Sequence, residues 1–289
     1  RLKCPDFKAR YTAPHPRWGG GPFSGKTLLV HYEQGMGDSI QFIRYLPQVK
    51  ALGGTVLYRD RPPLQALFDG TPGVDQFIST RETDLPHFDM QVSVMSLPYL
   101  FGTQAHSIPA TSVYLKAEVD KIKAVRPTIQ SHDFNVGIVW AGSKAHKNNQ
   151  NRSCDPALFQ TLAQCPGIGL YGLQRPDNEP AIPESLKTTL VTNLGEHFQD
   201  FSDTAGAIAH MDLVITVDTS VLHLACAMGK PTWALIPFVP DWRWMLDRAD
   251  SPWYPTLRLF RQAQPGQWDP VFDAITESLH HTLRIHRSH

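Results

Sequence analysis

The sequence is poor in cysteine, has no long apolar run and carries no net charge, and each absence excludes a class of protein. Its four cysteines are scattered and form no Cys-x-x-Cys pair, which is typical of reduced thiols rather than of a zinc site or a disulfide framework. No apolar run approaches the roughly 20 residues that cross a bilayer, and no signal peptide opens the chain. We therefore expect a cytoplasmic protein without a transmembrane segment, while peripheral contact with a membrane surface stays open.

Lysine and arginine together number 27, as do aspartate and glutamate, so the sequence lacks the basic excess with which proteins neutralise nucleic-acid phosphates. No nucleic-acid partner is expected, and any phosphate binding must be local. The sequence also contains no Asp-x-Asp pair, which is the metal clamp of many sugar-nucleotide enzymes. We therefore expect neither a metal nor another cofactor.

What the sequence does have is enough apolar residues, 42% of 289, for two domains of about 150 residues. Short apolar runs alternate with helical patterns in two cycles, which predicts mostly parallel sheets with helices on their faces. A polar segment at 116–133 separates the cycles and is the predicted linker. We expect an α/β protein with two doubly wound, Rossmann-like domains at 1–125 and 134–268. A C-terminal helix within 269–289 would follow, with packing back on the first domain as one option.

Ligands of open parallel sheets bind at the carboxyl ends of the strands, and two turns of this kind stand out. The first, Glu33–Asp38 (E-Q-G-M-G-D), lies between a predicted strand and a predicted helix over 38–52. Gly35 and Gly37 would let the backbone approach a ligand closely. The third glycine of a dinucleotide fingerprint is absent. Spacing alone leaves two interpretations open for Asp38, a helix N-cap or a carboxylate that faces the ligand.

The second turn, Val217–His223 (V-D-T-S-V-L-H), leads from a central strand directly into a helix. Three backbone N–H groups at its start would have no partner inside the helix: those of Ser220, Val221 and Leu222. Together with the helix dipole they favour an anion such as a phosphate or diphosphate. His223 would donate to the same anion or be a satisfied core residue. Asp218 and Thr219 would line the turn or cap the helix.

A third feature is the polar loop that follows the predicted strand ending at Trp140. Its cations Lys147 and Arg152 would lie at the same sheet edge as the second turn. An arginine offers a bidentate fork to diphosphate oxygens, so Arg152 is a candidate phosphate partner. The alternative is that the loop is only a solvated surface.

Two motifs are long enough to carry a resemblance: G-M-G-D at 35–38, and D-L-V-I-T-V-D-T-S-V-L-H-L-A-C-A-M-G-K-P at 212–231. Their pairing resembles glycosyltransferase family 9, the heptosyltransferase-like enzymes of the two-domain GT-B fold. H-Y-E-Q-G-M-G-D-S-I-Q-F-I-R-Y, N-R-S and P-D-W-R-W-M-L-D-R-A-D-S-P-W-Y-P-T are similar to the transferase domain at the C-terminal end of bacterial proteins with tetratricopeptide repeats. The resemblance extends over nearly the whole chain, from Trp18 to Trp268.

The resemblance implies metal-independent transfer of a sugar, heptose or another, from a nucleotide-diphosphate donor to an acceptor. The donor would be bound mainly by the second domain and the acceptor by the first, with an interdomain cleft as the active site. Asp38 matches the family's general base. The family's diphosphate-binding turn matches Asp218, Thr219, Ser220 and His223, with Ser220 in place of the usual glycine. The family's phosphate-binding lysine falls near Arg152, with Lys147 as the alternative.

Further candidates for the donor nucleotide or sugar are Gly142, Ser143, Gln174, Asp241, Trp242 and Arg243. Five of the seven tryptophans lie within 233–268, where they would contact a sugar or fill the junction between domains. The acceptor would be a glycan, lipopolysaccharide or another lipid-linked molecule, or a protein. Because the chain begins with Arg1 rather than Met, we expect that it is a fragment preceded by a repeat region.

Two other functions stay open at this point. One is a nucleotide-sugar or glycan-binding module that has lost turnover, and the other is a nucleotide-sugar epimerase of the same fold. Release of free nucleoside diphosphate would distinguish a transferase from a binding module. An isomerised product formed without an acceptor would identify an epimerase.

Overall fold

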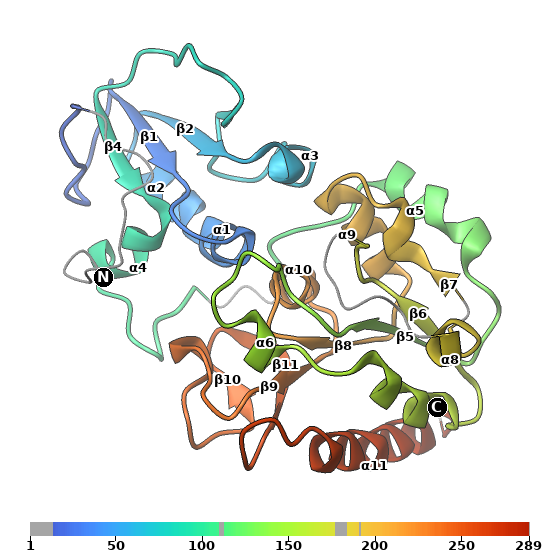
Figure 1. Ribbon diagram of the computed structural model, residues 1–289. Coiled ribbons are helices and arrows are strands. Elements are labelled where there is room, and N and C mark those ends of the chain that lie inside the picture. Colours follow the sequence, from blue (N-terminus) through green and yellow to red (C-terminus); the bar gives the residue numbers. More distant parts are fainter. Residues whose placement is uncertain (1–13, 110–112, 177–183, 191, 289) are drawn as a thin grey trace. The chain divides into compact units, whose positions relative to one another are not determined.

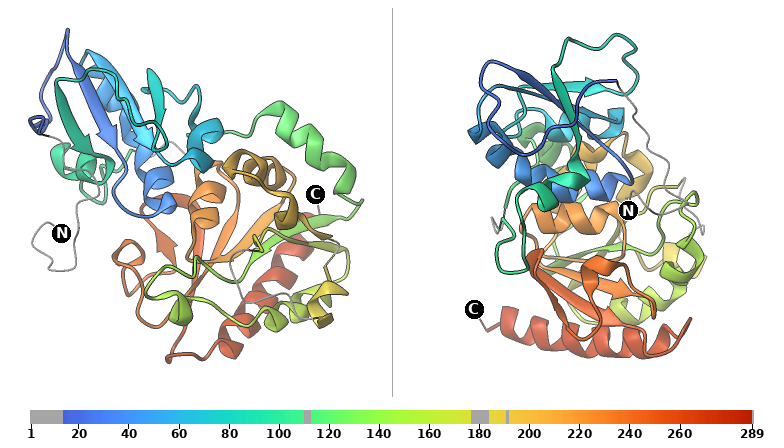
Figure 2. Two further views of the ribbon diagram at one scale, coloured as in Figure 1. Left: turned by 45° about the horizontal axis from the view of Figure 1, so that its top comes forward. Right: turned by 90° about the vertical axis from the view of Figure 1, so that its left-hand side faces the viewer.

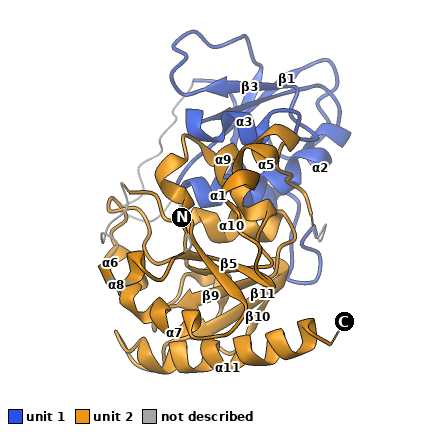
Figure 3. Cartoon of the chain, turned by 90° about the vertical axis from the view of Figure 1, so that its right-hand side faces the viewer, with its two compact units in different colours: residues 1–109 blue, residues 110–289 orange. Residues whose placement is uncertain are grey.

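The computed structural model describes residues 14–109, 113–176, 184–190 and 192–288. The chain divides into two compact units, residues 1–109 and 110–289 (Figure 3). Arg1 and Cys4, which entered the sequence analysis, lie outside the described residues. The three described cysteines form no disulfide and are buried: Cys154, Cys165 and Cys226.

The first unit is built on a four-stranded parallel sheet of order β3-β2-β1-β4 (Figure 1). Its strands are β1 Thr27–His31, β2 Thr55–Asp60, β3 Gln76–Ser79 and β4 Met90–Ser93. The helices and 3₁₀ turns are short: α1 Met36–Phe42, η1 Ile43–Tyr45, α2 Leu46–Ala51, η2 Pro62–Leu64, α3 Gln65–Phe68, η3 Val94–Ser96 and α4 Leu97–Leu100. Since β1 has neighbours on both sides, its apolar run is buried, as expected of a central parallel strand.

The second unit contains a seven-stranded sheet of order β10-β11-β9-β8-β5-β6-β7. Its strands are β5 Phe134–Val139, β6 Ile168–Gly172, β7 Thr192–Asn193, β8 Leu213–Val217, β9 Thr232–Ile236, β10 Asp250–Ser251 and β11 Tyr254–Arg261. All pairings are parallel except that of β10 with β11. Without β10, the order read from the other edge is the 3-2-1-4-5-6 of the Rossmann fold, whose switch point lies between β5 and β8.

Helices cover both faces of the second sheet. They are α5 Val119–Val125, α6 Asn149–Arg152, α7 Gln160–Ala163, α8 Glu184–Lys187, α9 Phe201–Ala209, α10 Ser220–Ala227 and α11 Asp269–His286, with 3₁₀ turns η4 Arg126–Thr128, η5 Pro156–Phe159, η6 Leu194–His197 and η7 Trp242–Trp244. Figures 1 and 2 show α10 and α11 on opposite faces. Because β5 and β8 are neighbouring parallel strands, the loops that follow them leave the sheet at the same edge.

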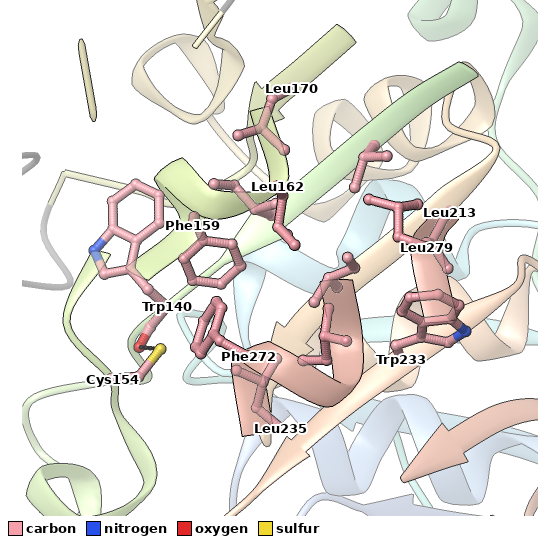
Figure 4. Packing of buried hydrophobic residues seen from close by; sticks show 14 of the residues in the cluster. Trp140, Cys154, Phe159, Leu162, Leu170, Leu213, Trp233, Leu235, Phe272 and Leu279 are labelled. Atoms are coloured by element: carbon pink, nitrogen blue, oxygen red, sulfur yellow. Dashed lines mark hydrogen bonds between the residues drawn. The ribbon is translucent and has the colours of Figure 1, made fainter. Parts of the chain in front are cut away.

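The core under α11 explains why the second unit holds together (Figure 4). The helix buries one apolar stripe: Val271, Phe272, Ile275, Leu279 and Leu283. Phe272 meets Phe159 edge to face, with ring centroids 4.9 Å apart. Each such side chain contributes about 1.5–3 kcal/mol when it is fully buried. The stripe faces the second unit's own sheet, so the apolar face of α11 is used within its own unit.

The prediction of a linker at 116–133 is wrong. This segment contains α5, which packs on α9 within the second unit. Lys121 Nζ donates to Asp203 Oδ1 at 2.6 Å, and His210 Nε2 donates to the Ile122 carbonyl at 2.8 Å. Gly206 of α9 permits this approach, since a Cβ there would lie 2.7 Å from the Lys121 carbonyl oxygen. The sequence of this segment is polar because its two-turn helix buries no side chain fully.

Candidate functional site

In the first unit, the glycine-rich loop connects β1 to α1 and fixes Asp38 in the first helical turn. The helix begins at Met36, and Gly35 is its N-cap with extended backbone. Asp38 is the third helical residue rather than the N-cap, because the predicted helix over 38–52 starts two residues earlier and is interrupted by η1. Its Oδ2 accepts a hydrogen bond from the Gly35 backbone N–H at 2.6 Å. The carboxylate therefore satisfies the start of its own helix, where the dipole favours negative charge.

Two buried acids that the sequence analysis did not select lie at the same edge. Glu33, in the loop after β1, accepts a hydrogen bond from the hydroxyl of Ser93 at the end of β4. Asp60 ends β2 and is fully buried, with its Oδ1 2.9 Å from Arg61 Nε. Tyr58 donates to the other oxygen of Asp60 at 2.9 Å. Glu33 and Ser93 lie far apart in the sequence, so no local pattern indicates their contact. For Asp60, the one signal in the sequence is its position at the end of a strand.

His31, the last residue of β1, is buried and pairs with the neighbouring strand. Its Nε2 lies 2.9 Å from Oε1 of Gln91, and its Nδ1 lies 2.9 Å from the Tyr32 carbonyl oxygen. Burial lowers the pKa of His31, with the two hydrogen bonds and the Glu33 charge opposing the shift. The imidazole is therefore neutral at pH 7 and serves as a hydrogen-bonded link within the sheet.

In the second unit, the turn Val217–His223 has the geometry predicted from the sequence. Thr219 is the N-cap of α10 in extended conformation, and its side chain makes no capping hydrogen bond. Its hydroxyl instead lies 3.2 Å from that of Thr216. The first-turn amides of Ser220, Val221 and Leu222 therefore have no acceptor inside the helix and none from the cap.

Arg152 ends α6 and reaches this turn from the neighbouring β5 loop. Its guanidinium donates to the Asp218 carbonyl oxygen at 2.9 Å. A Cβ on Gly142 would lie 2.3 Å from a guanidinium nitrogen, so the arginine packs directly on glycine backbone. Burial lowers the pKa of Arg152, and the charges of Asp218 and Asp241 oppose this shift. The side chain nevertheless remains a cation at neutral pH.

An aromatic cluster contacts the Asp218 side chain through Trp244. Trp244 is fully buried and its Nε1 donates to Asp218 Oδ2 at 2.9 Å. The Trp244 ring stacks on buried His223, with centroids 5.6 Å apart, and His223 Nδ1 lies 2.8 Å from the Tyr254 hydroxyl. Burial raises the pKa of Asp218, helped by Asp241, while the Trp244 hydrogen bond and nearby arginines oppose the shift.

The other donor candidates differ in exposure. Ser143 and Lys147 are exposed, whereas Gln174 is buried and accepts a hydrogen bond from the Ala141 amide at 3.0 Å. Gln174 thus connects the ends of β5 and β6. Lys147 lies within the loop, and Arg152 at its end contacts the Val217–His223 turn through the Asp218 carbonyl oxygen.

The turn at Asp241 presents an aromatic ring to solvent. Arg243 Nη1 lies 2.8 Å from Asp241 Oδ1, and its guanidinium lies 4.8 Å from the Trp242 ring centroid. Trp242 itself is 58% exposed and meets Trp253 edge to face. The five late tryptophans therefore do not form one surface.

Two of the five, Trp233 and Trp268, belong to the apolar core instead. Trp268 Nε1 donates to the Ser153 carbonyl oxygen at 3.1 Å. Among the described residues, no group of three or more His, Cys, Asp or Glu side chains could hold a metal ion. In that same part of the chain, no helix is long and apolar enough to span a bilayer.

Comparison with solved structures identifies the fold class. The chain matches a glycosyl transferase family 9 structure from Veillonella parvula with a TM-score of 0.62 at 12% identity, covering 85% of this chain and 88% of that one. It matches ADP-heptose lipopolysaccharide heptosyltransferase II of E. coli with a TM-score of 0.60 at 14% identity, covering 90% and 98%. Two Rossmann-like units of the GT-B class are therefore present, as the sequence predicts.

Sequence comparison finds a family model that matches part of the second unit. Residues 181–237 match the profile of glycosyltransferase family 9 (heptosyltransferase) and include the Val217–His223 turn. The predicted resemblance to this family is thus confirmed over this part of the sequence. Protein FlbA of Caulobacter vibrioides is 27% identical over 296 residues, covering 93% of this chain and 49% of FlbA. The chain therefore spans about half the length of this curated relative.

Proposed function

We propose that this chain is a metal-independent glycosyltransferase that uses a nucleoside-diphosphate sugar as donor. The observation that carries the proposal is the start of α10. Its first-turn amides lack a capping side chain, and Arg152 is fixed against the same turn through the Asp218 carbonyl. This pairing of a helix N-terminus with a partly buried cation supplies the two elements with which a protein without a metal can hold a diphosphate leaving group.

The acceptor would be activated by Asp38 in the first unit. Its carboxylate takes the proton of an acceptor hydroxyl while the hydroxyl oxygen forms a bond to the anomeric carbon. The bond from that carbon to the diphosphate oxygen breaks, and the nucleoside diphosphate leaves with the electron pair. The hydrogen bond from Gly35 holds Asp38 Oδ2 in place, and this supports a fixed base rather than a mobile surface acid.

The side chains around the Val217–His223 turn, which we call the donor turn, also have roles in this proposal. Trp244 holds the Asp218 carboxylate, and Tyr254 holds the His223 ring, so neither His223 nor Asp218 is free to swing away from the α10 start. His223 would donate a hydrogen bond to the diphosphate, as the family resemblance implies. Asp241, Trp242 and Arg243 would contact the donor sugar or base, with the exposed Trp242 ring as the surface for packing.

An ADP-linked heptose is the first donor to test. E. coli WaaC has been solved with ADP-2-deoxy-2-fluoro heptose, and this chain matches that structure with a TM-score of 0.57 at 9% identity over 89% of its own length and 99% of WaaC. A glycan, lipid-linked or protein acceptor would complete the reaction.

The proposal is tested by binding and by product release. A thermal-shift panel of ADP, UDP and GDP and their sugars should raise the melting temperature for one nucleotide series, because a ligand that binds only the native state stabilises it by mass action. That donor should then release free nucleoside diphosphate when a glycan, lipopolysaccharide or protein extract is added. Binding without release would identify a binding module, and isomerised donor without acceptor would identify an epimerase.

A further inference from the structure

Arg61 makes an unusual set of contacts around the loop that carries Asp38. Its Nη1 donates to the Gln34 carbonyl at 2.9 Å and its Nη2 to the Ser39 hydroxyl at 3.2 Å. The guanidinium also lies 4.6 Å from the ring centroid of Tyr32. One side chain from the end of β2 thus holds the β1–α1 connection at several points.

The arginine is itself fixed by a fully buried acid. Asp60 Oδ1 accepts from both the backbone N–H and the Nε of Arg61, at 2.7 and 2.9 Å. The other Asp60 oxygen accepts from the Tyr58 hydroxyl, and burial raises the pKa of that tyrosine. A buried ion pair is a weak source of net stability, because desolvation offsets the attraction. Its geometric consequence here is that the guanidinium has one orientation.

The two atoms that Arg61 holds lie on either side of the candidate base. Gln34 comes immediately before the N-cap Gly35, and Ser39 immediately follows Asp38. The Asp38 carboxylate in turn depends on the Gly35 N–H for its position. A shift of the first helical turn would therefore break contacts with Arg61 on both sides of Asp38.

We infer that Arg61 is a positioning residue, acting through Gln34 and Ser39 to hold the Asp38 carboxylate in one place. This inference rests on the proposed function for its catalytic consequence. The fork is essential to the geometry, because the carbonyl, the hydroxyl and Asp60 are reached by three different nitrogens. A lysine has the charge but only one nitrogen at the end of a flexible chain, so it would not replace the arginine.

The first test measures loop position without any substrate. Amide hydrogen exchange of a peptide covering residues 33–42 is compared in wild type, Arg61→Gln, Arg61→Lys and the control Arg81→Gln, which changes an exposed arginine of the same unit. Faster exchange in that peptide, in both Arg61 variants and not in the control, is expected. Unchanged exchange in both would overturn the inference, whatever the enzyme does. Global unfolding of Arg61→Gln would be recognised by exchange throughout the unit, and Arg61→Lys then decides.

The second test measures catalysis. Transfer from the donor that the wild type uses should fall about 10- to 100-fold in kcat in both Arg61 variants, since small misplacement of a catalytic group has effects of this size. The Kd of ADP should stay within twofold, because the donor turn lies in the other unit. A kcat within twofold of wild type contradicts the positioning role. Absence of transfer in the wild type refutes the proposed function instead, while the exchange result still decides whether Arg61 holds the loop.

Discussion

In each unit a strand leads through a loop into a helix, β1 into α1 at the first edge and β8 into α10 at the second edge. The two helix starts are filled in opposite ways. At α1, the residue in the first turn, Asp38, turns its own carboxylate to the Gly35 amide, and buried acids stand nearby. At α10, Thr219 turns its hydroxyl to Thr216 and leaves the helix start uncapped, with Arg152 beside it. The first edge is supplied with negative charge, whereas the second is arranged to receive it.

One architecture thus fills the start of a helix in two different ways. A helix N-terminus attracts anions in either unit, so what distinguishes the edges is whether the protein provides the anion itself. Where it does, the result is a fixed carboxylate that suits proton transfer. Where it does not, the helix start is the place that the proposed function gives to the donor diphosphate.

The largest expected effect comes from removing the charge at the first edge. Asp38→Asn should lower transfer by about 10²- to 10⁴-fold, the usual contribution of a positioned acid or base. The amide oxygen can still accept from Gly35, so the fold is kept. Rates are measured as nucleoside diphosphate release, and titration calorimetry should give an unchanged Kd for the nucleotide. The matched control Asp69→Asn alters an exposed carboxylate of the same unit and should leave the rate as it is. Near wild-type turnover in Asp38→Asn would remove Asp38 as the base.

At the second edge, Arg152→Ala should weaken nucleoside diphosphate binding by about 10- to 100-fold, as expected for loss of a charged hydrogen-bond donor. Gly142→Ala is a sharper variant, because it keeps the charge and forces the guanidinium to move. It should weaken binding too, with little loss of stability, since the clashing atoms end a flexible side chain. Lys147→Ala tests the alternative cation and should change the Kd by less than twofold. Calorimetry that gives an unchanged Kd for Arg152→Ala would contradict the proposal that the second edge binds the diphosphate.

Sequence reasoning finds the parts of these edges that are local in the chain. A strand, a short loop and a helix N-terminus follow one another within a dozen residues, so the positions of Asp38 and of Ser220–Leu222 could be read directly. Arg152 was found because it follows β5, the neighbour of β8. The Rossmann alternation likewise depends on local patterns and is recovered in both units.

The remaining parts depend on contacts between distant residues. Trp244 meets Asp218 across 26 residues and Tyr254 meets His223 across 31. Nothing in the local pattern distinguishes these aromatics from Trp233, which belongs to the core. β11 was not predicted, because the tryptophan-rich segment that leads into it was interpreted as contacting a sugar or filling the junction between domains. Arg61 stands beside Asp60 in the sequence, yet its link to Gln34 exists only because β1 and β2 are neighbours.

A smaller effect is expected from Asp218, the partly buried acid of the second edge. The folded pKa of Asp218 is raised above its unfolded value, mainly by burial, so the charged form is disfavoured in the folded state. Below the unfolded pKa of 3.8, Asp218 is protonated in both the folded and the unfolded state and costs no stability. Stability is then lost as the pH rises through the folded pKa. Asp218→Asn should therefore raise the melting temperature at pH 7, by about 2–4 °C per kcal/mol gained. The gain should vanish near pH 3, and a lower melting temperature at pH 7 would contradict this account.

The smallest effect serves as the reference for both edges, because it lies at neither. Lys121 and Asp203 join α5 to α9, and both side chains are partly exposed. Burial by itself would raise the pKa of Asp203, but the hydrogen bonds from Lys121 and the Gln199 and Asp200 amides lower it overall. The pair's contribution is therefore present above pH 3.8 and lost as pH falls through the lowered pKa. Lys121→Met should cost less than about 1 kcal/mol of unfolding free energy in urea, while both nucleotide binding and transfer stay unchanged. A change in nucleotide binding or in transfer would mean that α5 affects the donor turn through α9. The two edges would then depend on the helices that surround them, and the comparison between them would have to include those helices.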